Sequence, residues 1–262
     1  TEWHKLAERF KFYLIFPEEK KENQIQGCFR FSEKKHRQRD MGEVLSIKQM
    51  IDYAKSRLPI DSKRVYITGV SAGGSMAMNM ISAYPEIFAA AGVNAAVPYF
   101  CDKDVISVFS FCLPGNVHRT QAEWLERVKT GHPGYNGSYP KLMAIQGDGD
   151  QFVDPSNLDE ITKQWTAVHQ ISENPAKTDI FREHTHKIFT KNNQPDGEIL
   201  VETYLIHYMD HGTSIDPGKD EDQGGSIIKY DIDGIVVSFA YDRDFYSPYY
   251  IAKFFGLVKK SS

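Results

Sequence analysis

The sequence predicts an α/β fold in which helices cover both faces of a mostly parallel central sheet. Short apolar segments typical of strands alternate with longer segments whose apolar residues recur at helical spacing. The 262 residues contain neither an internal repeat nor a low-complexity linker, and 41% of them are hydrophobic, which is enough to bury a sizeable core. We therefore expect one domain that spans residues 1–262.

Charge and hydropathy argue against two classes of partner. The chain has 31 basic and 35 acidic residues, and no basic block alternates with aromatic residues as a nucleic-acid groove requires. No apolar run approaches the ~18–20 residues that a membrane-spanning helix needs, and the mean hydropathy is -0.46. We therefore expect neither nucleic-acid binding nor a membrane span.

The first half of the chain predicts two strands and two helices in alternation. Residues 11–16 form an apolar segment that indicates a strand, and Pro17 ends it. Residues 43–58 place their apolar side chains on one helical face. Residues 65–68 are β-branched and aromatic and indicate a second strand, whereas residues 75–81 are rich in Met and Ala and indicate a buried helix.

The second half continues this alternation. Residues 142–145 and 201–206 indicate a third and a fourth strand, and residues 249–257 indicate a closing helix. A helix between the third and fourth strands is predicted from one apolar stripe, which consists of Leu158, Ile161, Trp165 and Val168. Two stretches rich in Gly, Asp and Asn, 170–200 and 213–245, are expected to be irregular surface excursions.

Residues 69–73, Gly-Val-Ser-Ala-Gly, are the segment most suggestive of chemistry. They match G-x-S-x-G between a predicted strand and a predicted helix, where Ser71 would occupy a strained turn with its hydroxyl above the sheet edge. The following helix directs free N–H groups toward that point, and the N–H of Ala72 would be one oxyanion donor. The alternative interpretation is a glycine-rich turn with a solvated serine.

A nucleophilic serine requires a base and an acid, and both are expected at later strand ends. The order typical of this motif is Ser, then Asp or Glu, then His. The loop after the third predicted strand offers Asp148 and Asp150. Asp148 is typical of a turn-stabilising residue, which favours Asp150, a choice that rests on the resemblance described below. The loop after the fourth strand offers His211, whereas alternation would leave His207 in the sheet.

The potential metal ligands do not form a recognisable site. His184 and His186 lie two positions apart, but no third or fourth ligand stands near them. Four carboxylates lack the spacing of a calcium loop and are expected to be solvated: Asp216, Asp220, Glu221 and Asp222. His132 and His169 are expected at the surface.

The cysteines, Cys28, Cys101 and Cys112, are too few and too scattered for a zinc site or a disulfide-dense scaffold. Two interpretations of them stay open. One is a single disulfide with one spare thiol, and the other is three free thiols.

Segments throughout the chain carry a family resemblance. They are residues 3–19, 39–43, 65–74, 84–90, 98–101, 132–135, 209–213 and 251–257. In these segments the chain resembles the polyhydroxybutyrate depolymerase esterases, a family that also includes feruloyl and acetylxylan esterases. The resemblance implies an α/β-hydrolase fold and a catalytic triad of Ser71, Asp150 and His211.

The resemblance also implies a reaction and its setting. A serine carboxylic ester hydrolase acts through an acyl-serine intermediate, and no metal or organic cofactor is expected. The implied substrate is a hydroxyalkanoate polyester or oligoester, or alternatively a feruloyl or acetyl group on a plant polysaccharide. Because the resembling enzymes mostly act outside the cytoplasm, a secreted or periplasmic location is implied as well.

Two departures from the family pattern bear on the site. The family's Cys-Phe/Trp-Asn-Trp appears here as Cys-Phe-Arg-Phe at residues 28–31, which predicts an altered pocket wall. The family also has an upstream strand ending in His-Gly-Cys, whose loop supplies a second oxyanion N–H, and this sequence starts after that point. We therefore expect a sheet without those N-terminal strands, in a domain that is N-terminally incomplete relative to the family.

Alternatives stay open for the pocket and for the class of function. Tyr99 and Phe152, together with Phe29, Phe31 and Phe100, are candidates to bind substrate at an apolar acyl site, and ordinary core packing is the alternative. A catalytically silent hydrolase-fold binding protein is the alternative function, motivated by the absent oxyanion loop. A dinucleotide-binding fold is disfavoured because the glycine-rich segment lacks the G-x-G-x-x-G spacing.

Overall fold

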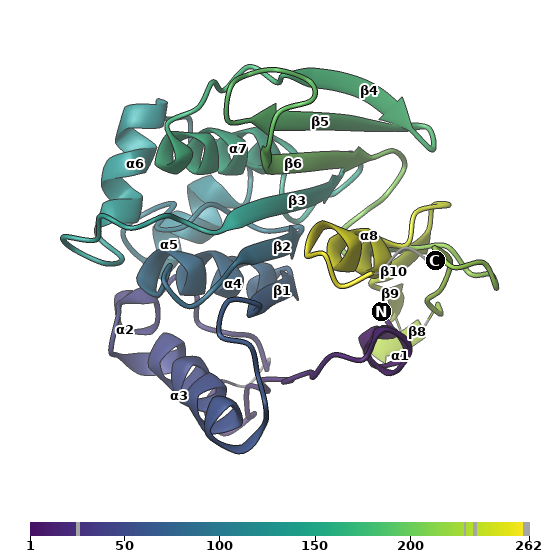
Figure 1. Cartoon of the computed structure of the whole chain (residues 1–262), viewed down its shortest axis with the longest axis horizontal. Coiled ribbons are helices and arrows are strands. Elements are labelled where there is room, and N and C mark those ends of the chain that lie inside the picture. Colours follow the sequence, from purple (N-terminus) through teal and green to yellow (C-terminus); the bar gives the residue numbers. More distant parts are fainter. Residues whose placement is uncertain (25–26, 228, 233–234, 259–262) are drawn as a thin grey trace.

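The chain folds around a six-stranded sheet with the strand order β1-β2-β3-β6-β5-β4 (Figure 1). The computed structural model describes residues 1–24, 27–227, 229–232 and 235–258. The strands are β1 (Tyr66–Val70), β2 (Ala90–Asn94), β3 (Lys141–Gly147), β4 (Lys177–Phe181), β5 (His184–Thr190) and β6 (Ile199–Ile206). β1, β2, β3 and β6 are parallel neighbours, and β5 and β4 extend the sheet in antiparallel pairing. The predicted mostly parallel sheet is confirmed.

Helices join the strands and cover both faces of the sheet. They are α1 (Trp3–Phe10), α2 (Lys34–Arg37), α3 (Gly42–Arg57), α4 (Ala72–Ala83), α5 (Val105–Ser107), the π-helical η1 (Val108–Cys112), α6 (Gln121–Lys129), α7 (Ser156–His169) and α8 (Ser247–Phe254). Two small strand pairs lie outside the main sheet: β7 (Thr213–Ile215) with β10 (Ala240–Asp242), and β8 (Lys229–Ile232) with β9 (Ile235–Ser238). Within the described part of the chain, no helix is long and apolar enough to cross a membrane.

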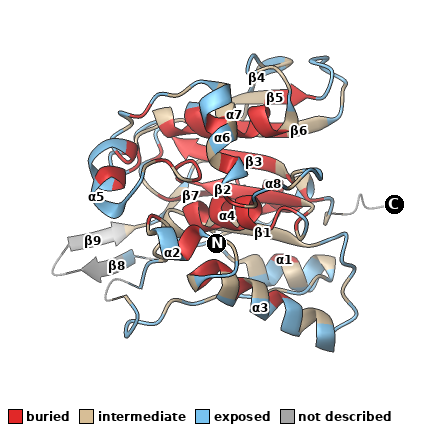
Figure 2. Cartoon of the chain, turned by 90° about the vertical axis from the view of Figure 1, so that its left-hand side faces the viewer, coloured by how far each residue is buried: buried red, intermediate tan, exposed pale blue. Residues whose placement is uncertain are grey.

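The side chains of β3 point alternately to the two faces of the sheet and so divide the core into two layers. Figure 2 shows the buried strands and α4 in red. Leu142 and Ala144 pack with residues of α3, α4 and α7, whereas Met143 and Ile145 pack with residues of α1 and α8. Gly92 of β2 allows α8 to approach closely, because a Cβ there would lie 2.5 Å from Cγ2 of Ile251. Apolar residues on both faces of one strand are what a parallel sheet covered by helices requires.

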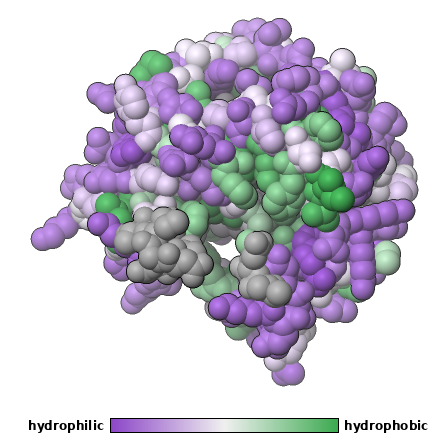
Figure 3. Space-filling view, turned by 180° about the vertical axis from the view of Figure 1, so that it is seen from behind, coloured by the Kyte–Doolittle hydropathy of each residue, from purple (hydrophilic) through white to green (hydrophobic). Residues whose placement is uncertain are grey.

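The strand predicted for residues 11–16 does not form. This segment has no regular secondary structure after the turn that ends α1, and no described strand pairs with it. A lone strand leaves its backbone donors and acceptors without ladder partners, so apolar composition alone does not produce one. The segment instead lines a cavity of about 690 Å³ together with the outer edge of β1. The face seen in Figure 3 is hollowed near its centre, with apolar side chains in green around the hollow.

The stretches 170–200 and 213–245, predicted to be irregular, contain strands β4, β5, β7, β8, β9 and β10 and the first residues of β6. Polar contacts hold β5 between its neighbours: the imidazole of His186 lies 2.7 Å from a carboxylate oxygen of Asp179 on β4 and 2.9 Å from one of Glu202 on β6. Cross-strand charge pairs stabilise a sheet as apolar pairs do, but they do not produce the apolar alternation that identifies a strand in sequence.

Two of the four acidic residues expected to be solvated, Asp216 and Asp222, pair with Arg182, whereas Asp220 is exposed as expected. The guanidinium lies 2.7 Å from a carboxylate oxygen of Asp216 and 2.7 Å from one of Asp222. Asp216 is 4% exposed, so the expectation of a solvated loop is wrong for this residue. Asp216 also lies near Asp242 and Asp244, with carboxylate oxygens within 4.8 Å of one another. Arg182 already supplies positive charge to this group.

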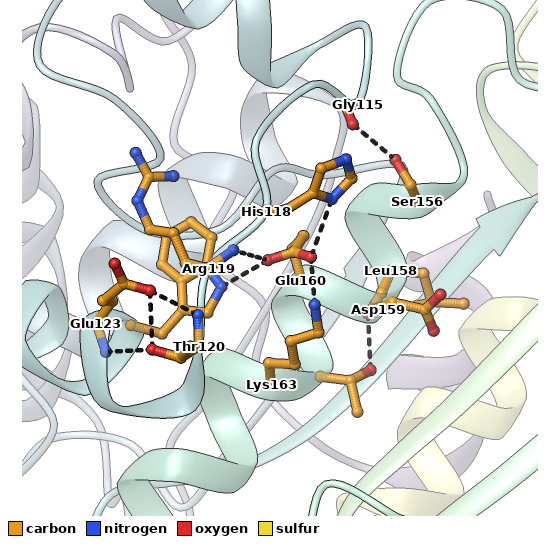
Figure 4. Close-up of polar contacts among 12 residues, drawn as sticks. Gly115, His118, Arg119, Thr120, Glu123, Ser156, Leu158, Asp159, Glu160 and Lys163 are labelled. Atoms are coloured by element: carbon orange, nitrogen blue, oxygen red, sulfur yellow. Dashed lines mark hydrogen bonds and ion pairs between the residues drawn. The ribbon is translucent and has the colours of Figure 1, made fainter.

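A buried carboxylate joins α6 to α7 (Figure 4). Glu160 accepts hydrogen bonds from Nε1 of Trp124 at 2.8 Å, from the backbone N–H of Arg119 at 3.1 Å and from Nζ of Lys163 at 2.6 Å. Burial has the largest single effect and raises the pKa of Glu160, but the interactions with Lys163 and the bonds from Trp124 and Arg119 together lower it by more, so its pKa stays below the usual range. The carboxylate is therefore ionised in the folded protein and links α7 to Trp124 of α6 and to the backbone of Arg119.

The two histidines expected at the surface are partly buried. His132 stacks on the ring of Tyr135 with 5.0 Å between the ring centroids. His169, at the end of α7, donates from Nε2 to the carbonyl oxygen of Pro140 at 3.1 Å. Burial lowers the pKa of His169 from 6.5 to about 4, against the opposing effect of the bond to Pro140.

The low pKa of His169 predicts a specific sensitivity to acid. Between its ordinary pKa of 6.5 and its folded pKa of about 4, the unfolded chain binds the proton and the folded chain does not, so stability falls as pH falls. We expect the free energy of unfolding to decrease less over this range in His169→Gln than in wild type. Urea denaturation at pH 7 and pH 4.5 measures this, and parallel losses in both proteins would contradict it.

Candidate active site

Three of the predicted site residues lie just after the carboxyl ends of strands, on the same side of the sheet. Ser71 follows β1, Asp150 lies in the loop after β3, and His211 lies in the loop after β6. Because these strands belong to the parallel part of the sheet, their carboxyl ends point the same way, where ligands gather in open α/β sheets.

The imidazole of His211 lies between the other two side chains. Its Nε2 is 2.7 Å from Oγ of Ser71, and its Nδ1 is 2.9 Å from Oδ2 of Asp150. An ionised carboxylate only accepts hydrogen bonds, so Nδ1–H donates to Asp150 and Nε2 is left to accept from the serine hydroxyl. An imidazole in this arrangement can activate a hydroxyl as a nucleophile.

Ser71 has a strained backbone, with φ 56° and ψ -122°. Strain of this kind costs about 1–3 kcal/mol and persists only where the surroundings hold it. The N–H of Ser71 donates to the carbonyl of Asn94 at 2.9 Å, and the N–H of Ser75 donates to the carbonyl of Ser71 at 2.9 Å. Helix α4 begins at Ala72, so the N–H groups of its first turn lie beside the serine without partners inside the helix.

Asp150 is buried and fully hydrogen-bonded, at 4% exposure. Its Oδ1 accepts from the N–H groups of Phe152 and Val153 at 2.9 and 2.8 Å, and its Oδ2 accepts from Nε2 of Gln146 at 2.8 Å as well as from His211. Burial has the largest single effect and raises the pKa of Asp150, but the interactions with His211 and the bonds from Val153 and Phe152 together lower it by more. The carboxylate is therefore charged and can stabilise an imidazolium.

A small third core supports the loop that carries Asp150. Val153 packs there with the segment after β2, whose Cys101 forms a disulfide with Cys112. The backbone N–H of Asp154 donates to the carbonyl of Leu113 at 2.8 Å. Of the two interpretations of the cysteines, the structure contains the one with a single disulfide, and Cys28 keeps an exposed thiol.

The residues not chosen as acid and base pair with each other. Nδ1 of His207 is 2.8 Å from Oδ2 of Asp148. Alternation had predicted that His207 lies within the sheet. However, β6 ends at Ile206, and His207 lies in the turn after the strand. The expectation failed because the strand ends one residue before the histidine.

The two aromatic residues predicted to bind substrate lie in different places. Phe152 is 54% exposed, and its ring centroid is 5.0 Å from that of His211. Tyr99 is 2% exposed and packs in the main core, so it is a core residue and offers no surface to a substrate. Phe239 was missed: it is 46% exposed, with its ring 6.4 Å from that of His211. Residues 235–240, Ile-Val-Val-Ser-Phe-Ala, are mostly apolar, but they lie in the stretch 213–245 that was expected to be an irregular surface excursion, so Phe239 was not assigned to the site.

The chain is similar to known esterases. Residues 1–177 match the family described as Esterase PHB depolymerase. The chain is 38% identical over 256 residues to poly(3-hydroxyalkanoate) depolymerase C of Paucimonas lemoignei, a match that covers 98% of this chain and 59% of that protein. It is 36% identical over 168 residues to an acetylxylan esterase of Coprinopsis cinerea, across 63% of this chain and 44% of that protein. The chain thus spans about half the length of these relatives.

A solved structure supports the fold. An acetyl xylan esterase from Aspergillus awamori superposes with a TM-score of 0.67 over 80% of this chain and 76% of that chain, at 24% identity. At this identity the likeness bears on the fold alone. The α/β-hydrolase fold predicted from the sequence is confirmed.

Matched alanine substitutions test the strained serine turn. A Cβ at Gly69 would lie 2.2 Å from the carbonyl oxygen of Gly73, whereas a Cβ at Gly73 meets no atom within 4 Å. We expect Gly69→Ala to lower the free energy of unfolding by about 1–3 kcal/mol, and Gly73→Ala to leave it unchanged or slightly higher. Thermal denaturation compares the two, and equal stabilities would contradict the packing of this turn.

Proposed function

The chain belongs to the Esterase PHB depolymerase family, and on that premise we propose that it hydrolyses carboxylic esters through an acyl-serine intermediate. The observation that carries the proposal is the imidazole of His211, held 2.7 Å from the hydroxyl of Ser71 and 2.9 Å from the carboxylate of Asp150. A hydroxyl bonded to an imidazole that is itself oriented by a buried carboxylate is the arrangement of a serine hydrolase.

In the proposed reaction, Oγ of Ser71 attacks the ester carbonyl carbon while its proton moves to Nε2 of His211. The N–H of Ala72 donates to the developing oxyanion, favoured by the start of α4. The tetrahedral intermediate collapses, the alcohol leaves with the proton from His211, and an acyl-serine remains. A water then attacks the acyl carbon, loses its proton to His211, and the acid is released as Ser71 regains its hydrogen. The steps require no metal or organic cofactor.

The proposed substrate is a hydroxyalkanoate polyester or its oligomers. The relative named as a poly(3-hydroxyalkanoate) depolymerase matches 98% of this chain, whereas the acetylxylan esterase matches 63%. Phe152 and Phe239, whose exposed rings have centroids 5.0 and 6.4 Å from that of His211, supply apolar surface for an aliphatic acyl chain. A feruloyl or acetyl group on a polysaccharide is the alternative substrate.

We also propose that the protein acts in an oxidising compartment, secreted or periplasmic. The disulfide between Cys101 and Cys112 supports this proposal, because disulfides persist mainly outside the reducing cytoplasm.

Active-site labelling tests whether the serine is activated. We expect a fluorophosphonate probe to label wild type and not Ser71→Ala, because only an activated hydroxyl attacks the phosphorus. Asp150→Asn is expected to lower kcat by about 10⁴-fold, since the amide no longer holds the imidazole in the required tautomer. If folded, monodisperse wild type stays unlabelled, the protein is a catalytically silent hydrolase-fold binding protein.

Product release distinguishes the substrates. We expect 3-hydroxybutyrate and its oligomers to be released from polymer films faster than ferulate or acetate from acylated xylan. Phe152→Ala is expected to raise KM for a butyrate ester more than for an acetate ester, because the longer acyl chain loses more apolar contact. Faster release from xylan would reassign the substrate and leave the reaction type intact.

A further inference from the structure

The position of His211 depends on a loop that crosses the edge of the sheet. His211 follows β6, and β3 and β2 lie between β6 and β1 in the sheet. Neighbouring strands are about 4.8 Å apart, so the ends of β6 and β1 are separated by roughly 14 Å. The imidazole nevertheless lies 2.7 Å from Ser71. The backbone between His207 and His211 must therefore turn away from β6 and toward β1.

The loop makes that turn at Tyr208, which has a left-handed backbone with φ 57°. This conformation costs a non-glycine residue about 1–2 kcal/mol, and the side chain of Tyr208 is 85% exposed. Packing of the ring therefore contributes little to holding the turn. Polar contacts to the backbone must stabilise it.

Those contacts come from both sides of Tyr208. Oδ1 of Asp148 accepts from the N–H of Tyr208 at 2.7 Å, and Oδ2 of the same carboxylate lies 2.8 Å from Nδ1 of His207. On the other side, Nε and Nη2 of Arg243 donate to the carbonyl oxygen of Tyr208 at 2.8 and 2.5 Å. Hydrogen bonds to charged groups are roughly twice as strong as neutral ones.

Each charged residue is itself held beside the loop. The N–H of Asp148 donates to the carbonyl of Ile206 at 3.0 Å, and Gly147 allows this approach because a Cβ there would lie 2.1 Å from the carbonyl oxygen of Met209. Arg243 follows β10, which pairs with β7, and its N–H donates to the carbonyl of Ile215 at 3.0 Å. Asp148 thus contacts the segment before His211, and Arg243 links that segment to the one after His211.

We propose that Asp148 and Arg243 are positioning residues that clamp the backbone of Tyr208 and thereby set the distance from His211 to Ser71 and Asp150. The inference rests on the proposed esterase activity. It assigns to Asp148 a role distinct from that of the neighbouring Asp150, which contacts the imidazole directly. Neither clamp residue contacts the triad side chains through the bonds described, so both act through the backbone.

The test compares Asp148→Ala, Asp148→Asn and Asp196→Ala on a soluble nitrophenyl ester. We expect Asp148→Ala to lower kcat by about 10- to 100-fold with KM within about threefold of wild type, because misplacing the base affects the transition state more than binding. Asp148→Asn should stay within about threefold of wild-type kcat, because its amide oxygen can still accept from the N–H of Tyr208. Asp196→Ala removes an exposed carboxylate from the turn between β5 and β6 and should match wild type.

The rate of fluorophosphonate labelling, measured on the same proteins, separates the two proposals. If wild type is not labelled, the esterase proposal fails. If wild type is labelled and Asp148→Ala matches Asp196→Ala, or if Asp148→Asn rescues nothing, the clamp is overturned. If circular dichroism shows that Asp148→Ala does not fold, Arg243→Ala and Arg243→Lys test the bonds to the carbonyl oxygen of Tyr208 instead. We expect Arg243→Lys to retain the higher kcat. Equal kcat values for these two variants overturn the clamp.

Discussion

The hydrogen bond between Nε2 of His211 and Oγ of Ser71 sets the geometry that the surrounding loops must provide. It joins the ends of two strands that are not neighbours, because β3 and β2 lie between them. No side chain covers such a span alone, so the backbone after β6 has to carry the imidazole across the edge of the sheet. The hydrogen bonds between the loops after β3 and β6, and the left-handed turn at Tyr208, serve that requirement.

The site also holds two locally unfavourable features. Ser71 adopts a strained backbone, and Asp150 keeps a negative charge at 4% exposure. Each persists because its surroundings compensate it: neighbouring backbone groups fix the serine turn, and donors from Gln146, Phe152, Val153 and His211 surround the carboxylate. Strain and buried charge that are compensated in this way are typical of functional sites.

The need of each strand for a hydrogen-bonded neighbour explains where prediction of the fold failed. Residues 11–16 have the composition of a strand and form none, because a strand requires a neighbour and no described strand pairs with them. Conversely, β5 pairs on both sides through His186, Asp179 and Glu202, and its sequence carries no apolar alternation. Strand formation depends on partners distant in sequence, whereas helices follow local signals and were predicted within a few residues: α3 and α7 from apolar periodicity, and α4 from its Met- and Ala-rich composition.

The fold class, the family and the strand ends that carry reactive side chains could all be inferred from the sequence, because strands, turns and motifs are encoded in contiguous residues. Which of those side chains meet could not be inferred without the folded structure. Asp148 and Asp150 are two residues apart, yet Asp150 bonds to His211 and Asp148 bonds to the backbone of Tyr208. Likewise, Tyr99 lies in the core, and Phe239 lies beside the imidazole. Hydrogen bonding and ring contact depend on distances in space, and those distances are set by how strands far apart in the chain pack together.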